Sequence, residues 1–284
     1  MSAWRLAYNQ LANIFIDYES TLAREVGELP HGWTGWKQFT INNIHHESDD
    51  ITSFYLSPSD GSRVPASKPG QYISIKRYID SVGYDQPRQY SISHNSGDYY
   101  RISVKREHPA NLPPGIVSNV LHSDMDVGDN IDVSAPFGEF VLNESVSTPV
   151  VLISAGVGFT PCVAMLDSIE SQSDSNRQVV YVHSTRNHQS HAMKQYIADV
   201  VSRHSNIDSS IWYTAPTNNP PSHVEYDHAG RIQLSKIQSQ VILPDADYYL
   251  CGPIPFMHNI QNQLSELGVD TNRIHSEVFG LDTR

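Results

Sequence analysis

The pattern of apolar and polar residues divides the chain into three stretches. Between residues 4 and 26, apolar side chains recur at helical spacing, which predicts a helix with one broad apolar face. Glycine and proline in residues 27–36 end this pattern and predict a linker. From residue 37 to about residue 146, short runs alternate apolar with polar residues, as in antiparallel strands. After residue 149, continuous apolar runs alternate with helical spacing, as in a parallel sheet buried on both faces.

The middle stretch predicts a closed or nearly closed antiparallel β-barrel, because its short strands are separated by turn signals such as Ser59-Asp60-Gly61 and Lys68-Pro69-Gly70. One helix, over residues 116–123, interrupts the strands. The predicted strands cover residues 39–41, 51–56, 72–75, 90–92, 102–104 and 131–133.

The last stretch predicts a doubly wound parallel α/β domain. Its predicted strands cover residues 150–154, 179–183, 210–213, 247–250 and 273–279, and its helices fall after Pro161 and near residues 191–202, 232–238 and 255–267. The expected fold class is therefore β + α/β, with one helix before the two domains. We place the boundaries at residues 1–32, 33–146 and 147–284.

Composition excludes several classes of protein. The formal net charge of −12 over 284 residues argues against a nucleic-acid partner, which requires a basic surface. We find no run of about 18 apolar residues and no signal-peptide pattern, so we expect neither a membrane span nor export. Two cysteines, Cys162 and Cys251, cannot make a disulfide framework and suit a cytoplasmic location.

The stretch Arg88-Gln89-Tyr90-Ser91 combines a guanidinium, a flat ring and a small hydroxyl. On a strand, Arg88 and Tyr90 share one face, while Gln89 and Ser91 share the other. A ligand with an anionic segment and a planar ring fits the first pair, and the serine hydroxyl reaches the edge of the ring. The same residue types also occur on ordinary half-buried strands.

A second candidate anion site lies at the start of the predicted helix in the barrel. Pro113-Pro114-Gly115 precedes the helix, which leaves its first amides open to an anion, and Ser118 adds a hydroxyl in the first turn. Arg88 and this turn together suit a pyrophosphate. A capped helix without a ligand is the alternative.

A glycine-rich turn follows the first strand of the α/β domain. Its residues are Gly156, Val157, Gly158, Phe159, Thr160 and Pro161. Strand, glycine turn and helix form the context in which a dinucleotide binds, with Thr160 expected to cap a helix that begins at Pro161. A tight turn without a ligand remains the alternative. Cys251 and Gly252 end a later strand at the same edge, where Cys251 either contacts a nicotinamide or is a small buried residue.

Fourteen histidines raise the question of a metal site. His45 and His46 point to opposite faces of a strand, and His188 and His191 flank a helix start without a carboxylate or cysteine nearby in sequence. A metal site needs at least a third protein ligand. We therefore expect scattered surface histidines and no metal.

Taken together, these motifs resemble the ferredoxin–NADP reductase superfamily, and more narrowly the reductase half of a flavohaemoglobin. The motifs in chain order are Trp33-Thr34-Gly35-Trp36, Pro69-Gly70-Gln71-Tyr72, Arg88 to Ser91, Val104-Lys105-Arg106-Glu107, Gly115 to Asn119, Val127-Gly128-Asp129, Pro136-Phe137-Gly138, Ala155 to Pro161, Cys251-Gly252-Pro253 and Ile274 to Gly280. Residues 3–25 resemble the last helix of the globin domain of that family, whose other helices and proximal haem histidine are absent from this sequence.

The resemblance implies two cofactors, FAD and NAD(P)H, and no haem in this chain. It places Tyr90, Ser91 and Glu277 at the reacting centre. The implied FAD-binding residues are Tyr72, Arg88, Gln89, Tyr90, Ser91, Gly115, Val117 and Ser118. The implied NAD(P)H-binding residues are Gly156, Val157, Gly158, Phe159, Thr160, Pro161, Cys251 and Gly252, and the residues beside the outer face of the flavin are Val278, Phe279, Gly280 and Leu281.

The resemblance also implies a reaction. Hydride passes from NAD(P)H to FAD, and single electrons then pass to a haem globin domain or protein, as in flavohaemoglobin nitric oxide dioxygenase. A stand-alone flavin reductase of a small acceptor or iron centre is an alternative, as is a nonenzymatic module that binds a globin partner. The choice between NADH and NADPH stays open. Ser184 and Arg186 follow a strand end where an arginine favours a 2′-phosphate, and Arg186 could equally be a solvated surface charge.

Overall fold

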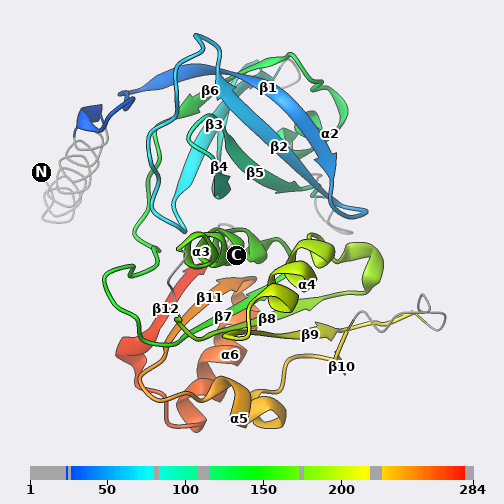
Figure 1. Cartoon of the computed structure of the whole chain (residues 1–284). Coiled ribbons are helices and arrows are strands. Elements are labelled where there is room, and N and C mark those ends of the chain that lie inside the picture. Colours follow the sequence, from blue (N-terminus) through cyan, green and yellow to red (C-terminus); the bar gives the residue numbers. More distant parts are fainter. Residues whose placement is uncertain are drawn as a thin grey trace, which may run out of the picture.

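The structure is a computed structural model that describes residues 24, 27–79, 83–107, 116–172, 176–217 and 226–278. Except for Arg24, the predicted N-terminal helix lies outside the described residues. Two bodies are stacked, a barrel above and a sheet covered by helices below, with helix α3 between them (Figure 1). The predicted fold class is confirmed.

The barrel is closed and antiparallel, with strand order β1-β2-β5-β4-β3-β6. Its elements are β1 (Trp36–His46), β2 (Ile51–Pro58), β3 (Tyr72–Ile79), β4 (Tyr84–Asn95), β5 (Tyr100–Lys105), α2 (Ile116–Ser123) and β6 (Asn130–Ser134). Apolar residues at alternate positions of the strands point inward and fill the barrel. Examples that are fully buried are Phe39, Ile41, Ile73 and Ile75. The predicted helix over residues 116–123 is confirmed as α2.

The second body is a parallel sheet with strand order β10-β9-β8-β7-β11-β12. Its elements are β7 (Val150–Ala155), η1 (Gly156–Gly158), α3 (Phe159–Ser171), β8 (Val179–Thr185), η2 (His188–Ser190), α4 (Lys194–Arg203), β9 (Ile207–Tyr213), β10 (His228–Ala229), η3 (Leu234–Ile237), α5 (Gln238–Val241), β11 (Asp247–Gly252), α6 (Ile254–Glu266), η4 (Thr271–Arg273) and β12 (Ile274–Val278).

Helices cover both faces of this sheet, which explains the continuous apolar run of β7. Val150 and Leu152 join a core with α3 and α4, whereas Val151 and Ile153 join a separate core with α5 and α6. Side chains on both faces of β7 therefore pack against apolar residues of the covering helices. Phe140 and Leu142, which follow the barrel, also belong to the first of these cores. The predicted boundary after residue 146 stays a prediction.

Two differences from the predicted elements have a physical cause. The first half of β4 is exposed and polar, so it lacks the alternation that predicts a strand, and it forms because β3 pairs with it as far as Tyr84. The two-residue strand β10 is too short for a pattern, and it pairs only with the end of β9.

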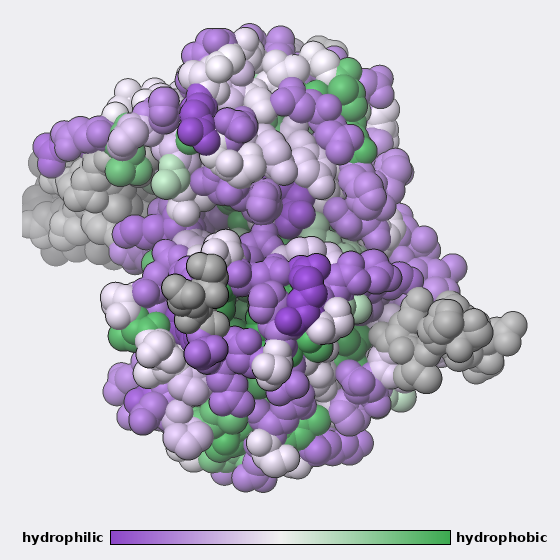
Figure 2. All heavy atoms as spheres, viewed as in Figure 1, coloured by the Kyte–Doolittle hydropathy of each residue, from purple (hydrophilic) through white to green (hydrophobic). Residues whose placement is uncertain are grey.

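The face of the molecule in Figure 2 is mainly hydrophilic, with apolar residues in small separate groups. Within the described part of the chain, no helix combines the length and the apolar character needed to cross a bilayer.

Gly70 and Gly61 offer a test of how the barrel meets the segment that leads to the sheet. Both have a left-handed backbone, with φ of 107° and 73° respectively. A Cβ at Gly70 would lie 2.0 Å from the carbonyl oxygen of Phe140, whereas a Cβ at Gly61 would meet open space. We expect G61A to lower stability by about 1 kcal/mol through backbone strain alone, and G70A by about 3 kcal/mol or more. Equal losses in urea unfolding would contradict this close approach.

Candidate functional site

The order of the strands locates a crevice at the edge of the parallel sheet. From β7 the chain crosses to β8 on one side, and β11 later adds on the other side. Ligands of open α/β sheets bind outside the carboxyl ends of the strands at such a reversal. The predicted glycine turn follows β7, and Cys251 and Gly252 end β11, so the structure brings these two motifs together.

The two glycines of the turn do different things. A Cβ at Gly158 would lie 2.3 Å from the carbonyl oxygen of Cys251, so Gly158 permits close contact between the turn and β11. Gly156 has a φ of 53°, and a Cβ there would meet nothing within 4 Å. Gly156 therefore leaves open backbone at the crevice, as an approaching phosphate requires.

The prediction that Thr160 caps a helix beginning at Pro161 is wrong. The 3₁₀ turn η1 runs directly into α3, so the helix begins at Phe159 and Gly158 occupies the N-cap without a side-chain hydrogen bond. The Thr160 hydroxyl instead donates to the carbonyl oxygen of Val157 at 3.1 Å. The side chains of Phe159, Thr160 and Pro161 are buried, whereas Val157 is only partly buried.

On the barrel side, β4 presents the predicted flavin-binding residues. Arg88 and Gln89 are exposed, and Nη1 of Arg88 donates to the carbonyl oxygen of Pro87 at 2.7 Å. Tyr90 is partly buried, and this burial raises the pKa of its phenol. The positive charge of nearby Arg88 acts in the opposite direction and is the smaller effect. Ser91 pairs with Tyr72 on β3 and is 4% exposed.

The hydroxyl of Ser91 has no hydrogen-bond partner among the described residues, although it is buried. A buried polar atom without a partner costs about 1–3 kcal/mol, so this hydroxyl calls for an explanation, and a bound group that contacts it would supply one. The position of this hydroxyl fits the predicted contact with a flavin edge.

Helix α2 is held to the barrel by Arg106, which sequence reasoning noted only as part of a motif. Its guanidinium donates from Nε to Oδ1 of Asn119 at 3.1 Å and from Nη2 to Oγ of Ser123 at 2.9 Å. Val117 is buried in the barrel core, and the buried Ser118 hydroxyl accepts from the backbone N–H of Glu107 at 3.3 Å. Gly115 lies outside the described residues.

Glu277 lies on β12, directly beside Cys251 on β11. Burial raises the pKa of its carboxyl to about 7, and its Oε2 atom has no hydrogen-bond partner in the described ranges. Glu277 and Ser91 are therefore both buried polar groups that a bound cofactor could satisfy. Val278 is exposed at the end of β12, and Phe279, Gly280 and Leu281 lie outside the described residues.

Both cysteines are buried. Burial raises the pKa of Cys162 to about 12, with Glu277 adding to the effect, and raises the pKa of Cys251 well above its usual value for the same reasons. Thiols in this state are poor nucleophiles. The interpretation of Cys251 as a small buried residue fits this environment.

The expectation of surface histidines is wrong for His183 and His191. Both are buried, and their rings stack with centroids 5.5 Å apart. Burial lowers the pKa of His183 well below its usual value, and its Nδ1 lies 2.9 Å from the hydroxyl of Ser154. A neutral imidazole can be buried at little cost when it is hydrogen-bonded, as His183 is to Ser154 and His191 is to Tyr213, and the sequence alone does not show these partners. No group of three His, Cys, Asp or Glu side chains within the described residues could hold a metal ion.

A separate cavity of about 1040 Å³ lies between the barrel and α3. Its walls come mainly from the segment before β3, the end of β4, the segment after β6 and the polar side of α3. None of the predicted cofactor residues lines it. The cavity therefore does not coincide with the predicted site. The buried Ser91 hydroxyl and Glu277 carboxyl, which have no partner among the described residues, locate the site better.

The raised pKa of Glu277 has a consequence for stability without a cofactor. A buried carboxyl that binds its proton more tightly when folded stabilises the protein fully below its unfolded pKa, and this contribution is lost as the pH rises. The loss should run from about the unfolded value of 4.5 to the folded value of about 7. The difference in melting temperature between E277Q and wild-type FAD-free protein should therefore grow from pH 4.5 to pH 7 and level off above it. A constant difference would show that Glu277 has an ordinary pKa.

Comparison with known proteins agrees with this geometry. A family profile described as "Oxidoreductase NAD-binding domain" matches residues 152–262. The chain is 45% identical over 282 residues to a flavohemoprotein of Bordetella pertussis. The aligned region covers 99% of this chain and 69% of that protein. A flavohemoprotein of Rhizobium meliloti is 42% identical over 283 residues, covering 99% of this chain and 70% of that protein.

Two solved structures have the same fold. The FAD/NAD-binding domain of a nitric oxide dioxygenase from Vibrio cholerae is 40% identical with a TM-score of 0.77, covering 86% of this chain and 99% of that one. A flavohemoglobin from Malassezia yamatoensis, solved with bound FAD and heme, is 26% identical with a TM-score of 0.81, covering 98% of this chain and 68% of that one. The sequence identity, the coverage and the shared fold show that this chain belongs to the flavohemoprotein family and carries its FAD- and NAD-binding reductase part.

Proposed function

We propose that this chain takes hydride from NAD(P)H with FAD as its cofactor and passes single electrons to a haem globin. The observation that carries the proposal is the buried Ser91 hydroxyl, which has no hydrogen-bond partner in the part of the chain that the structure describes. On the same strand, Arg88 and Tyr90 supply a guanidinium and a phenol. When bound, FAD would supply the conversion of a two-electron donor into one-electron steps. The protein would contribute binding, alignment and electrostatics.

The binding role falls to residues on two elements of the barrel. Arg88 and the first turn of α2 would hold the pyrophosphate, because a guanidinium and open helix amides both favour anions. Arg106 would keep α2 in place through Asn119 and Ser123. Tyr90 would pack against the flavin ring as a neutral phenol, since its burial disfavours the phenolate.

The alignment role falls to the crevice. Gly156 would let the nucleotide pyrophosphate approach the backbone, and Gly158 would keep the turn against Cys251. The Ser91 hydroxyl would donate to, or accept from, the edge of the flavin where hydride arrives. Glu277, whose pKa is about 7, could hold a proton at the same centre near neutral pH.

The choice of acceptor rests on the relatives. The Malassezia flavohemoglobin carries both FAD and heme, and residues 3–25 of this chain resemble the last globin helix of the family. We therefore propose a haem globin domain or protein as the partner, with nitric oxide dioxygenation as the reaction of the combined system and the cytoplasm as its location.

Purified wild-type protein and an S91A variant test this proposal. The wild-type protein should bind FAD, lose its flavin absorbance anaerobically with NADH or NADPH, and then reduce an added haem globin. S91A should keep its FAD, while the rate of flavin reduction falls about tenfold, as expected for the loss of one hydrogen bond at the reacting centre. Protein without affinity for FAD would contradict the proposal. FAD-loaded protein that reduces iron chelates but never a globin would instead favour a stand-alone reductase.

The nucleotide preference can be tested at the end of β8. Arg186 is exposed there, beside the buried Ser184. We propose that Arg186 contacts the 2′-phosphate when NADPH is the donor. R186Q should then raise the KM for NADPH about tenfold and leave the KM for NADH unchanged. Equal changes for both nucleotides would show that Arg186 does not contact the 2′-phosphate.

A further inference from the structure

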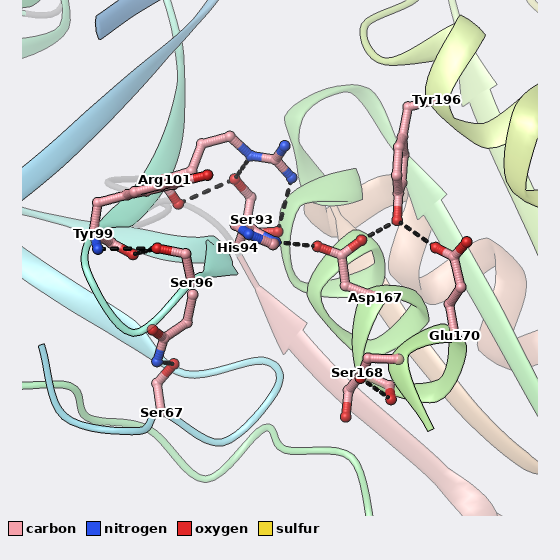
Figure 3. A network of polar contacts seen from close by, with 12 residues as sticks. Ser67, Ser93, His94, Ser96, Tyr99, Arg101, Asp167, Ser168, Glu170 and Tyr196 are labelled. Atoms are coloured by element: carbon pink, nitrogen blue, oxygen red, sulfur yellow. Dashed lines mark hydrogen bonds and ion pairs between the residues drawn. The ribbon is translucent and has the colours of Figure 1, made fainter. Parts of the chain in front are cut away.

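Strand β4 and helix α3 each carry one part of the site and, farther along, one member of a polar pair. Ser91 precedes His94 on β4, and Phe159 precedes Asp167 on α3. Nδ1 of His94 lies 2.7 Å from Oδ2 of Asp167 (Figure 3). At the usual rise per residue, the pair lies about 10 Å from Ser91 and about 12 Å from the start of α3. The two elements are thus tied together at the wall of the separate cavity, which His94 and Asp167 both line, and the pair can act on the crevice only through the rigid strand and helix.

An irregularity in β4 sets the direction of His94. The register between β4 and β5 shifts between Ile92 and His94, and such a bulge re-aims the side chain that follows it. Arg101 fixes the bulge, because its Nε donates to Oγ of Ser93 and its Nη2 to the carbonyl oxygen of Ser93, both at 3.0 Å (Figure 3). His94 is therefore held toward α3 by the local structure of the barrel.

Asp167 is held from the other side by helix α4. The hydroxyl of Tyr196 donates to Oδ1 of Asp167 and lies 3.3 Å from Oε2 of Glu170. Burial and these two carboxylates raise the pKa of Tyr196, so its phenol remains a donor. Glu170 also pairs with Arg203 of α4. One carboxylate oxygen of Asp167 is thus fixed within the α/β domain, which leaves the other for His94.

We propose that His94 and Asp167 are positioning residues that fix α3 along β4, and with it the separation between Ser91 and the glycine turn. The proposal rests on the proposed function, because that separation matters for hydride transfer. The side chains are 34% and 18% exposed, so the pair should add little to stability. Its effect should appear in the rate, since a misplacement of about 1 Å can slow a reaction about a hundredfold.

The test compares anaerobic flavin reduction at saturating nucleotide in H94L, D167A and the double variant. Each single variant should reduce its flavin about tenfold more slowly, with FAD content near that of the wild type. The melting temperature of H94L should stay near that of the wild type, whereas that of D167A should fall, because the Tyr196 hydroxyl also loses its acceptor. The double variant should be no slower than D167A, because each single variant already removes the contact between His94 and Asp167. H94N places an amide N–H close to the position of Nδ1 and should restore most of the rate. R203Q removes one contact between α3 and α4, the pairing of Arg203 with Glu170, and leaves the pair of His94 and Asp167 in place, so it should reduce its flavin at the wild-type rate.

A second measurement uses FAD-free protein. Hydrogen–deuterium exchange should rise in residues 91–95 and in residues 159–167 together in H94L, and in neither segment in R203Q. Wild-type rates in H94L and D167A, or losses that multiply in the double variant, would overturn the positioning role, as would unchanged exchange in H94L. A wild-type protein whose FAD neither nucleotide reduces would overturn the proposed function instead, and the exchange measurement would still test the contact.

Discussion

Helix α3 packs against the parallel sheet and against the barrel at the same time, and the geometry of the site depends on these two contacts. Its apolar face packs in the core of the sheet, and the helix also lies against β4 of the barrel (Figure 1). Its first turn continues directly from β7 through two glycines. Whatever orients α3 therefore orients the nucleotide turn relative to the strand that carries Ser91. The crevice has a defined geometry because the same helix, α3, packs against both the barrel and the parallel sheet.

The sequence predicts the elements of this arrangement better than their contacts. Alternation and continuous apolar runs predict the barrel and the parallel sheet, because burial on one face or on two leaves a direct mark on the pattern. The exposed half of β4 leaves no such mark, since pairing with β3 alone makes it a strand. The start of α3 at Phe159 is equally hidden, because backbone winding through η1 decides it rather than a capping side chain.

For the site, the sequence predicts which motifs share the crevice edge but not what each side chain does there. Gly156 and Gly158 look alike in the sequence, yet one faces open space and the other faces a carbonyl oxygen. The pair formed by His94 and Asp167 has no sequence signal at all, because a barrel strand and a helix of the next domain supply one residue each. The buried state of His183 likewise follows from stacking that only the fold creates.

The burial of both cysteine thiols affects how a redox protein resists oxidation. Oxidants and electrophiles attack the thiolate form of cysteine, and they need access to the sulfur atom. Cys162 and Cys251 are the only cysteines in the sequence, and both are fully buried with a raised pKa. The folded protein consequently offers peroxides no ready sulfhydryl target, and alkylating reagents should label it only after it unfolds.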